Sequence, residues 1–295
     1  MNGCAKKRFE NYKQQPLEFV FDKSFTGKLS QFGLDPNRRT PSGIKAAIIR
    51  EKGTNGEREM AYMLYLAGFD VKDVTMTDLI SGRETLEDIN MVVYCGGFSN
   101  SDVLGSAKGW AGSFLFNPKA KAALDNFYAR EDTLSLGVCN GCQLMMELGL
   151  ITPEDKKKGK MLHNDSHKFE SNFLGVTVPM NRSVMFGSLS GSKLGIWVAH
   201  GEGKFSLPYP EDHYNVVLKY SYDEYPGNPN GSDYSVAGIA SQDGRHLAMM
   251  PHLERACFPW ENAYYPLDRK EEDQITPWME AFVNARKWVE ANRKK

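Results

Sequence analysis

The sequence predicts an α/β fold in which a mostly parallel central sheet is flanked by helices and gains further strands in its second half. Two observations favour this class. Apolar, β-rich runs alternate with helical periodicity in the first half, as in strand–helix units that build a parallel sheet. Strand-like runs outnumber helical ones in the second half. The 295 residues, 41% of them hydrophobic, are enough for one substantial core or two modest ones.

The first half predicts a regular alternation of elements. Between Glu57 and Ala67 apolar residues recur at helical spacing, and Gly68 is a residue that commonly ends a helix. The expected elements, in chain order, are strand 44–50, helix 57–67, strands 69–74 and 89–95, helix 118–129 and strand 134–138. Ligands collect at the carboxyl ends of parallel strands. Residues 95–97 and Cys139 lie at such ends, which makes them candidates for a functional site.

The second half predicts additional strands and one closing helix. The expected strands are 172–179, 195–200, 214–222, 235–241 and 245–250. The helix, about 277–292, carries an apolar stripe formed by Trp278, Phe282, Ala285 and Val289 that we expect to dock on the core. Residues 1–40 show few periodic apolar positions. We therefore predict a lead-in or connector segment over 1–40 that packs on something else, and one domain over 41–295.

Cys139 stands at a sharp turn from a hydrophobic strand into a helix. A side chain on such a turn projects away from the backbone, and the amide groups at the start of the helix favour a thiolate. Gly137 and Gly141 fit the turn because they lack the Cβ atom that would clash where strand and helix approach each other closely. The sequence therefore predicts that Cys139 is a nucleophile.

His252 and Glu254 supply a candidate base and its partner. Residues two apart in an extended segment face the same way, so Glu254 could orient His252 while His252 takes a proton from Cys139. For a lone histidine, an ordinary polar residue at a strand end is the favoured interpretation. The cysteine turn reverses that preference and predicts a Cys-His-Glu triad.

Two glycine- or cysteine-containing motifs have competing interpretations. The loop GGFS at 96–99 is by itself an ordinary turn, but beside a nucleophile it predicts an oxyanion hole formed by the Gly97 and Asn140 amides. The CNGC motif has the spacing of redox and zinc sites, yet no second CxxC completes a ligand set. We expect no metal. Gln143 shares the helix face of Cys139 and could line the pocket.

These motifs resemble the class I glutamine amidotransferases, and in particular the glutaminase end of the large, single-chain phosphoribosylformylglycinamidine synthases. The resemblance runs from about residue 44 to the C-terminus. It is carried by GVCNGCQ at 137–143, GGFS at 96–99, His-x-Glu at 252–254, SDVLGSAKGWAGSFLFN at 101–117, HGEG at 200–203, NPNGS at 228–232 and PWMEAFVNAR at 277–286. Leu253 departs from the family, where we expect proline, and this puts the geometry of the turn in question more than the residues themselves.

The resemblance implies a set of site residues. The catalytic residues would be Cys139, His252 and Glu254, with Gly97 and Asn140 as oxyanion donors. The expected substrate contacts are Gly96, Phe98, Ser99, Gln143, His200 and Gly201. Pocket or structural roles are also implied for Asn164, Ser166, Phe169 and Glu170.

The implied activity is that of a ligase that uses glutamine as amido donor. Glutamine hydrolysis would supply ammonia for the ATP-dependent conversion of formylglycinamide ribonucleotide to formylglycinamidine ribonucleotide in de novo purine biosynthesis. Its partners would be glutamine and a synthetase portion, in the same or a partner chain. No cofactor is expected in this domain, and ATP and Mg would be bound only by the synthetase portion. The alternatives are a catalytically silent or regulatory glutaminase-like module, and another thiol hydrolase on the same fold.

Composition argues against several other classes of protein. The formal net charge of −1 offers no basic surface for nucleic acid or an anionic membrane. No apolar run approaches the roughly 18 residues of a membrane span, and the polar N-terminus lacks the apolar core of a signal peptide. Five cysteines fit reduced thiols better than a disulfide framework. We therefore expect a cytoplasmic location, with no nucleic-acid or membrane partner.

Overall fold

A nine-stranded sheet forms the centre of the described part of the chain. The structure, a computed structural model, describes residues 4–11, 13–14 and 17–293. The strand order is β3-β1-β4-β6-β13-β12-β11-β8-β9. The parallel strands are β3 (Asp70–Thr75), β1 (Lys45–Arg50), β4 (Met91–Tyr94), β6 (Leu134–Val138) and β13 (His246–Met249). The antiparallel extension contains β12 (Val236–Ala240), β11 (Asn215–Tyr220), β8 (Glu170–Thr177) and β9 (Lys193–His200). The predicted fold class is therefore confirmed.

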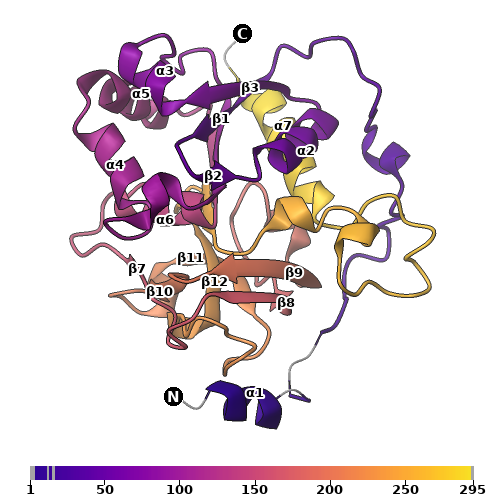
Figure 1. Ribbon diagram of the computed structural model, residues 1–295. Helices are drawn as coiled ribbons and strands as arrows, with labels where there is room; N and C mark the ends of the chain where they lie inside the picture. The colour runs from indigo at the N-terminus through magenta and orange to yellow at the C-terminus, as the bar shows by residue number, and fades with distance from the viewer. Residues whose placement is uncertain (1–3, 12, 15–16, 294–295) are drawn as a thin grey trace.

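Helices cover both faces of the parallel half of the sheet (Figure 1). On one side α2 (Glu57–Ala67) packs with the closing helix α7 (Met279–Asn292). On the other side lie α3 (Met76–Ser81), α4 (Lys108–Leu115), α5 (Pro118–Ala129) and α6 (Asn140–Glu147). The antiparallel strands form the lower part of the molecule in this view. The α/β half and the β-rich half thus share one continuous sheet.

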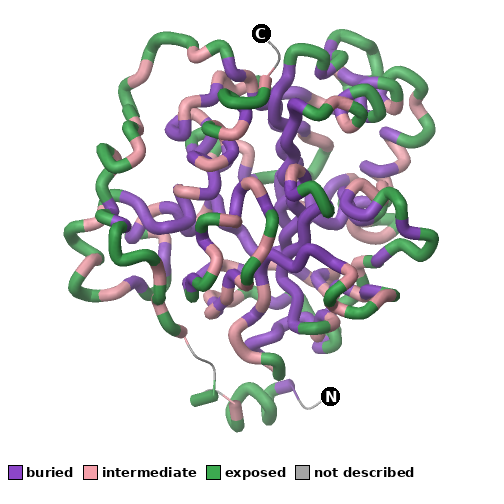
Figure 2. The backbone as a smooth tube through the Cα atoms, turned by 180° about the vertical axis from the view of Figure 1, so that it is seen from behind, coloured by how far each residue is buried: buried purple, intermediate pink, exposed green. Residues whose placement is uncertain are grey.

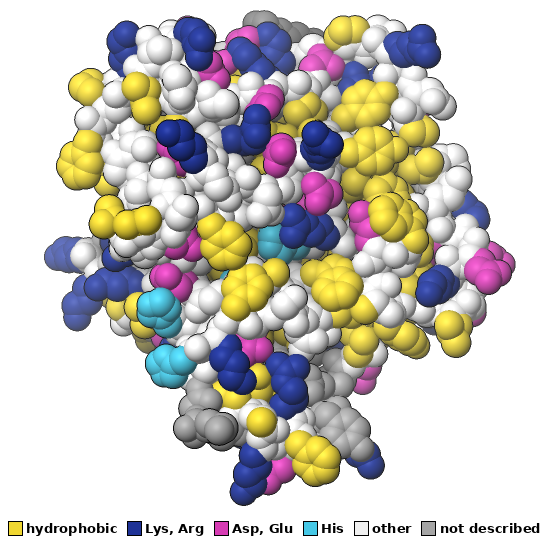
Figure 3. All heavy atoms as spheres, viewed as in Figure 1, with side chains coloured by type: hydrophobic (Ala, Val, Ile, Leu, Met, Phe, Trp, Pro, Cys, Tyr) yellow, Lys and Arg dark blue, Asp and Glu magenta, His cyan; other side chains and the backbone are white. Residues whose placement is uncertain are grey.

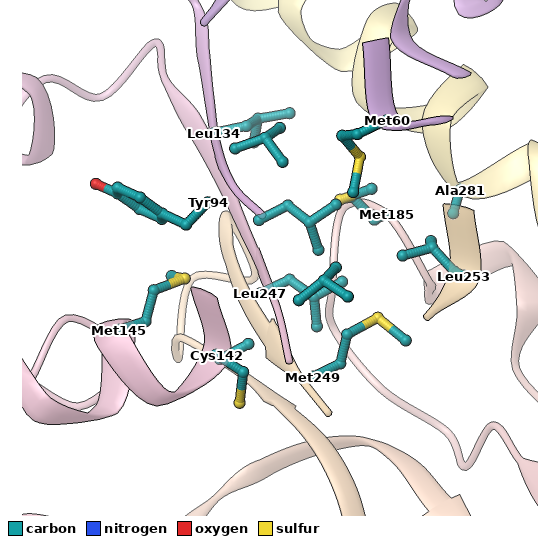
Figure 4. Packing of buried hydrophobic residues seen from close by; sticks show 14 of the residues in the cluster. Met60, Tyr94, Leu134, Cys142, Met145, Met185, Leu247, Met249, Leu253 and Ala281 are labelled. Carbon is teal, nitrogen blue, oxygen red and sulfur yellow. The ribbon is translucent and has the colours of Figure 1, made fainter. Parts of the chain in front are cut away.

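The core runs along the middle of the molecule, where the tube in Figure 2 is continuously buried. Figure 4 shows Met145 and Cys142 of α6 beside Tyr94 on one side of the strands, and Met60 of α2 and Ala281 of α7 on the other. All five side chains are buried. Their helices are therefore fixed to the sheet by apolar packing, and α6 holds the turn at Cys139 rigidly.

Most elements that the sequence predicts are present, and the missed ones are short. The structure adds α1 (Cys4–Asn11), α3 and α4. It also adds two small strand pairs: β2 (Thr54–Asn55) with β5 (Gly96–Gly97), and β7 (Lys160–Leu162) with β10 (Lys204–Ser206). The helix α3 spans only six residues and depends on a capping box between Thr75 and Asp78. Such elements are too short to produce a clear periodic pattern.

The segment before residue 44 packs against the domain. Val20 exchanges backbone hydrogen bonds with Lys193 at the edge of the sheet, with N–O distances of 2.8 and 2.7 Å, and Phe25 is buried in the core. The predicted division at residue 40 stays a prediction, and positions 1–3, 12 and 15–16 of the lead-in lie outside the described residues.

Candidate active site

Cys139 sits in a constrained backbone conformation between β6 and α6. Its φ of 53° and ψ of −107° are unusual for a residue with a side chain and indicate strain of the kind found at functional sites. Hydrogen bonds from the Cys139 amide to the Met249 carbonyl (2.9 Å) and from the Gln143 amide to the Cys139 carbonyl (3.0 Å) hold it there. A Cβ on Gly137 would lie 2.5 Å from the Gly141 carbonyl oxygen. The glycine is therefore required by the close approach of strand and helix.

His252 and Glu254 form a buried pair at the start of a short 3₁₀ turn over Leu253–Arg255. The distance from His252 Nδ1 to Glu254 Oε1 is 2.6 Å, and the two side chains are 3% and 2% exposed. The His252 amide donates to the Trp197 carbonyl at 2.9 Å, which ties the turn to β9. Leu253 is fully buried and the turn forms with it in place of proline.

Cys139 and His252 meet above Gly96. A Cβ built on Gly96 would lie 2.8 Å from His252 Cε1 and 3.3 Å from Cys139 Cβ. The missing side chain therefore leaves the space in which imidazole and thiol approach each other. The Cys139 Sγ also lies 3.5 Å from the Ala199 carbonyl oxygen. The structure thus brings Cys139 together with the His252–Glu254 pair from two segments far apart in the sequence.

The electrostatic surroundings favour a charged imidazole at His252. Burial lowers the pKa of His252. The charges of Glu254 and Cys139 and the hydrogen bonds with both outweigh burial and raise the pKa to about 10. His200 shows the opposite behaviour, because burial and the charge of His252 lower its pKa to about 3. One imidazolium and one neutral imidazole therefore stand in the same site.

The two predicted oxyanion donors flank Cys139. Asn140 is the first residue of α6, and the amides of a first helical turn have no carbonyl partner within the helix. Gly97 belongs to β5, has a φ of +113° and lines the pocket. The Ser99 amide donates to Asn140 Oδ1 at 3.0 Å. This bond joins the GGFS loop to the start of α6 and fixes the two predicted donors relative to each other.

A pocket of about 380 Å³ opens beside Cys139. Of the predicted residues it is lined by Gly97, Phe98, Cys139, Gln143, Phe169, His200 and Gly201. Lining residues that the sequence analysis did not select are Asp102, Ser106, His163, His167, Lys168, Ala199 and Glu202. Asp102 lies within the motif at 101–117 and Glu202 within HGEG at 200–203. Their positions in these two motifs are the sequence signal that could have identified them as pocket residues. Rings of Phe98 and Phe169 approach within 5.9 Å at their centroids.

Other predicted residues support the pocket from behind. Ser99 is buried and Gly96 lies beneath the thiol and imidazole. Asn164 holds the HGEG loop: its Nδ2 donates to the His200 carbonyl at 2.8 Å and its Oδ1 accepts from the Gly203 amide at 3.0 Å. These contacts give Asn164 a structural position rather than a place in the pocket lining.

Ser166 and Glu170 also lie away from the pocket lining. Ser166 is buried near the NPNGS loop, in a second cavity with Asn228 and Gly231. Glu170 pairs with Arg8 of α1 at 3.0 Å, and its Oε1 accepts from the Tyr225 hydroxyl at 3.1 Å. Glu170 therefore anchors α1.

The remaining cysteines are buried thiols. Burial raises the pKa of Cys95, Cys142 and Cys257 well above the usual value. Within the described part of the chain, no group of three or more His, Cys, Asp or Glu side chains is arranged to hold a metal ion. None of the helices in that part combines the length and the apolar character that a bilayer span requires. Lysine, arginine and acidic side chains are interspersed on the face shown in Figure 3.

Comparisons with known proteins identify the family of the chain. Residues 43–289 match the family described as CobB/CobQ-like glutamine amidotransferase domain. The probable phosphoribosylformylglycinamidine synthase of Arabidopsis thaliana, chloroplastic/mitochondrial, is 44% identical over 84% of this chain and 19% of its own length. The human phosphoribosylformylglycinamidine synthase is 44% identical over 85% of this chain and 21% of its own length. The chain spans about a fifth of the length of these curated relatives.

One solved structure shares both fold and detectable sequence similarity. The structure of PurLQS from Thermotoga maritima has a TM-score of 0.61 and 28% sequence identity, and the match covers 83% of this chain and 99% of that one. The resemblance found in the motifs is therefore accompanied by a similar fold over 83% of the chain.

Proposed function

Because the chain belongs to the family of CobB/CobQ-like glutamine amidotransferase domains, we propose that it is the glutaminase portion of a phosphoribosylformylglycinamidine synthase and releases ammonia from glutamine at Cys139. The observation that carries the proposal is that the buried His252–Glu254 pair meets Cys139, which lines the pocket. A thiol, an imidazole and an orienting carboxylate are the groups that acyl transfer from an amide requires.

The first half of the reaction forms a thioester. The Cys139 thiolate attacks the carboxamide carbon of glutamine, and the carbonyl oxygen takes up negative charge. His252 gives its proton to the amide nitrogen, the carbon–nitrogen bond breaks, and ammonia leaves a γ-glutamyl thioester on Cys139. The raised pKa of His252, about 10, means that the imidazole holds the proton that the leaving nitrogen needs.

The second half returns the enzyme to its starting state. His252, now neutral, takes a proton from water, and the resulting hydroxide attacks the thioester carbon. The carbon–sulfur bond breaks, glutamate leaves, and Cys139 becomes a thiolate beside the protonated imidazole. The amides of Gly97 and Asn140 would stabilise the oxyanion in both halves, and loss of one such donor typically costs about 10²- to 10³-fold in rate.

The ammonia acceptor lies outside this chain's own site. We propose that ammonia passes to a synthetase portion that uses ATP and Mg to convert formylglycinamide ribonucleotide to its amidine in purine biosynthesis. The support is the match to synthases of which the chain spans about a fifth. A cytoplasmic location remains a prediction from the sequence.

Selective labelling of the thiol tests the proposed function. The chain is treated with a diazoketone analogue of glutamine, with and without free glutamine, and modified peptides are identified by mass spectrometry. We expect labelling at Cys139 that glutamine suppresses and that Cys139→Ala abolishes. Labelling spread over the other cysteines, or insensitive to glutamine, would contradict the proposal.

A further inference from the structure

Two carboxylates share one wall of the pocket. Asp102 comes from the loop after β5, and Glu202 follows β9. Both contact Ser106: its amide donates to Glu202 Oε2 at 3.3 Å, and its hydroxyl donates to Asp102 Oδ2 at 3.4 Å. Burial and the neighbouring charge of Glu202 raise the pKa of Asp102. The two acids are therefore close enough to disfavour each other's charge.

Three polar side-chain atoms of residues that line the pocket have no hydrogen-bond partner among the described residues. Asp102 Oδ1 is buried and has no hydrogen-bond partner among the described residues. The His200 side chain is 2% exposed and lines the same pocket, and neither of its ring nitrogens contacts a hydrogen-bonding group of another described residue. Unsatisfied buried polar atoms are costly and call for an explanation. A positively charged donor bound in the pocket would offset the repulsion between the carboxylates of Asp102 and Glu202.

The pocket is also lined by basic side chains. Lys168, His163 and His167 line it together with the two acids. A ligand with both an ammonium and a carboxylate group matches such a lining, and a free α-amino acid is the smallest molecule of that kind. Cys139 lies in the same pocket, so a side-chain carboxamide could reach the thiol while the charged end meets the acids.

We infer that Asp102, with Glu202 beside it, binds the α-ammonium group of the substrate and makes the site selective for free glutamine over amides that lack this group. The inference rests on the proposed function and names residues beyond the predicted site. Asp102 is a specificity-determining residue that contacts the substrate far from the reacting bond.

The backbone around Asp102 holds the carboxylate in place before the ligand binds. Asn100, Ser101 and Asp102 have φ values of 52°, 57° and 52°, a left-handed run that persists only where surrounding contacts enforce it. The Asn100 amide donates to the Lys52 carbonyl at 2.8 Å, and the Gly105 amide donates to the Asp102 carbonyl at 2.9 Å. A preformed carboxylate of this kind loses little conformational entropy on binding.

The test compares two electrophiles that differ in one group. Cys139 is labelled by the diazoketone analogue of glutamine and by the same compound with hydrogen in place of the α-amine, in the parent chain and in Asp102→Asn. We expect the parent to react faster with the amine-bearing compound and Asp102→Asn to lose about tenfold or more of that preference. Iodoacetamide, which needs no amino-acid recognition, should label both proteins at rates within about twofold of each other.

Asp125→Asn removes an exposed carboxylate of α5 that pairs with Lys121 and should retain the full preference. If Asp102→Asn keeps the parent's preference, or slows all three reagents equally, the inference is wrong. A parent chain that reacts with iodoacetamide at Cys139 but with neither glutamine-like compound would instead overturn the proposed function, and this inference with it.

Discussion

The imidazole of His252 is buried, yet its surroundings favour the charged form. Desolvation alone would make it a weak base, as it does for His200 a short distance away. Glu254 reverses the effect through a 2.6 Å contact. The pKa values of the two histidines therefore differ because His252 has Glu254 and Cys139 as partners, whereas His200 has the charge of His252 beside it.

Replacing Glu254 tests this assignment directly. Glu254→Gln keeps the shape of the side chain but removes its charge, so the pKa of His252 should fall from about 10. We expect the rate of Cys139 labelling at neutral pH to drop by about 10²- to 10⁴-fold, with the pH profile shifted. Glu261→Gln provides a control, because the Glu261 carboxylate accepts from the Phe258 amide at 3.1 Å, whereas His252 pairs with Glu254. Equal rates in Glu254→Gln and the parent chain would contradict the role of Glu254.

Gly96 offers a second test at the same scale. Gly96→Ala would place a methyl group 2.8 Å from His252 Cε1, and the imidazole would have to move. We expect a loss of about 10²-fold in labelling rate, since displacements of about 1 Å at a reacting geometry have effects of this size. Circular dichroism should show an unchanged fold. Unaltered labelling would mean that Gly96 does not set the approach of thiol and imidazole.

The grouping of Cys139, His252 and Glu254 could be predicted from the sequence, and so could part of the pocket lining, whereas Asp102 and Glu202 were not selected. Cys139 stands at a strand-to-helix turn that is visible in the sequence, and His252 and Glu254 are recognised by their spacing of two residues. Asp102 and Glu202 come from loops far apart in sequence, and an acid in a loop has no pattern of its own. Only the fold places both beside Ser106.

At the scale of elements, the turn from β6 into α6 depends on glycines that leave no room for a side chain. A Cβ on Gly141 would collide with the Tyr94 carbonyl oxygen of β4. Gly141→Ala should therefore lower the free energy of unfolding by about 1–3 kcal/mol. Gly112→Ala in α4 is the matched control, since its Cβ would meet only ordinary contact with Phe116 at 3.7 Å.

Chemical denaturation distinguishes the two glycine variants. The midpoint should fall for Gly141→Ala and stay level or rise for Gly112→Ala, because alanine favours a helix over glycine by up to about 1 kcal/mol. Equal midpoints for Gly141→Ala and the parent chain would show that the turn tolerates a side chain.

The long elements of the fold were predictable and the short ones were not. The strands β1, β4 and β6 and the helices α2 and α5 have continuous apolar or helical patterns. The helix α4 contains two glycines among eight residues, which weakens its helical signal, and it is stabilised by burial of Trp110 and Phe114. Such elements form because of tertiary packing, which cannot be inferred from the local pattern of a single sequence.

At the scale of the whole molecule, buried histidines set the response of stability to acid. The pKa of His200 is lowered to about 3 by burial and His252, and that of His246 to about 4 by burial and Arg245. Both take up protons more readily when unfolded, where the pKa is near 6.5. They contribute stability above pH 6.5 and lose it as the pH falls toward 4. His252, whose pKa is raised, keeps its full contribution over that range.

Urea unfolding at a series of pH values measures this effect. Between pH 6.5 and 4.5 each of the two histidines should remove up to about 1.4 kcal/mol of stability per pH unit. His246→Gln should make the dependence shallower, because it removes one of these groups while leaving the pocket intact. A parent and a variant with the same slope would exclude His246 as a source of acid sensitivity.

We propose that glutamine hydrolysis proceeds through a covalent intermediate on Cys139. The most direct measurement is intact and peptide mass spectrometry of the chain after acid quenching during incubation with glutamine. We expect a γ-glutamyl adduct confined to Cys139, together with glutamate in solution, and neither product with Cys139→Ala. Glutamate formed by Cys139→Ala, or a parent chain that gives neither adduct nor glutamate, would contradict it.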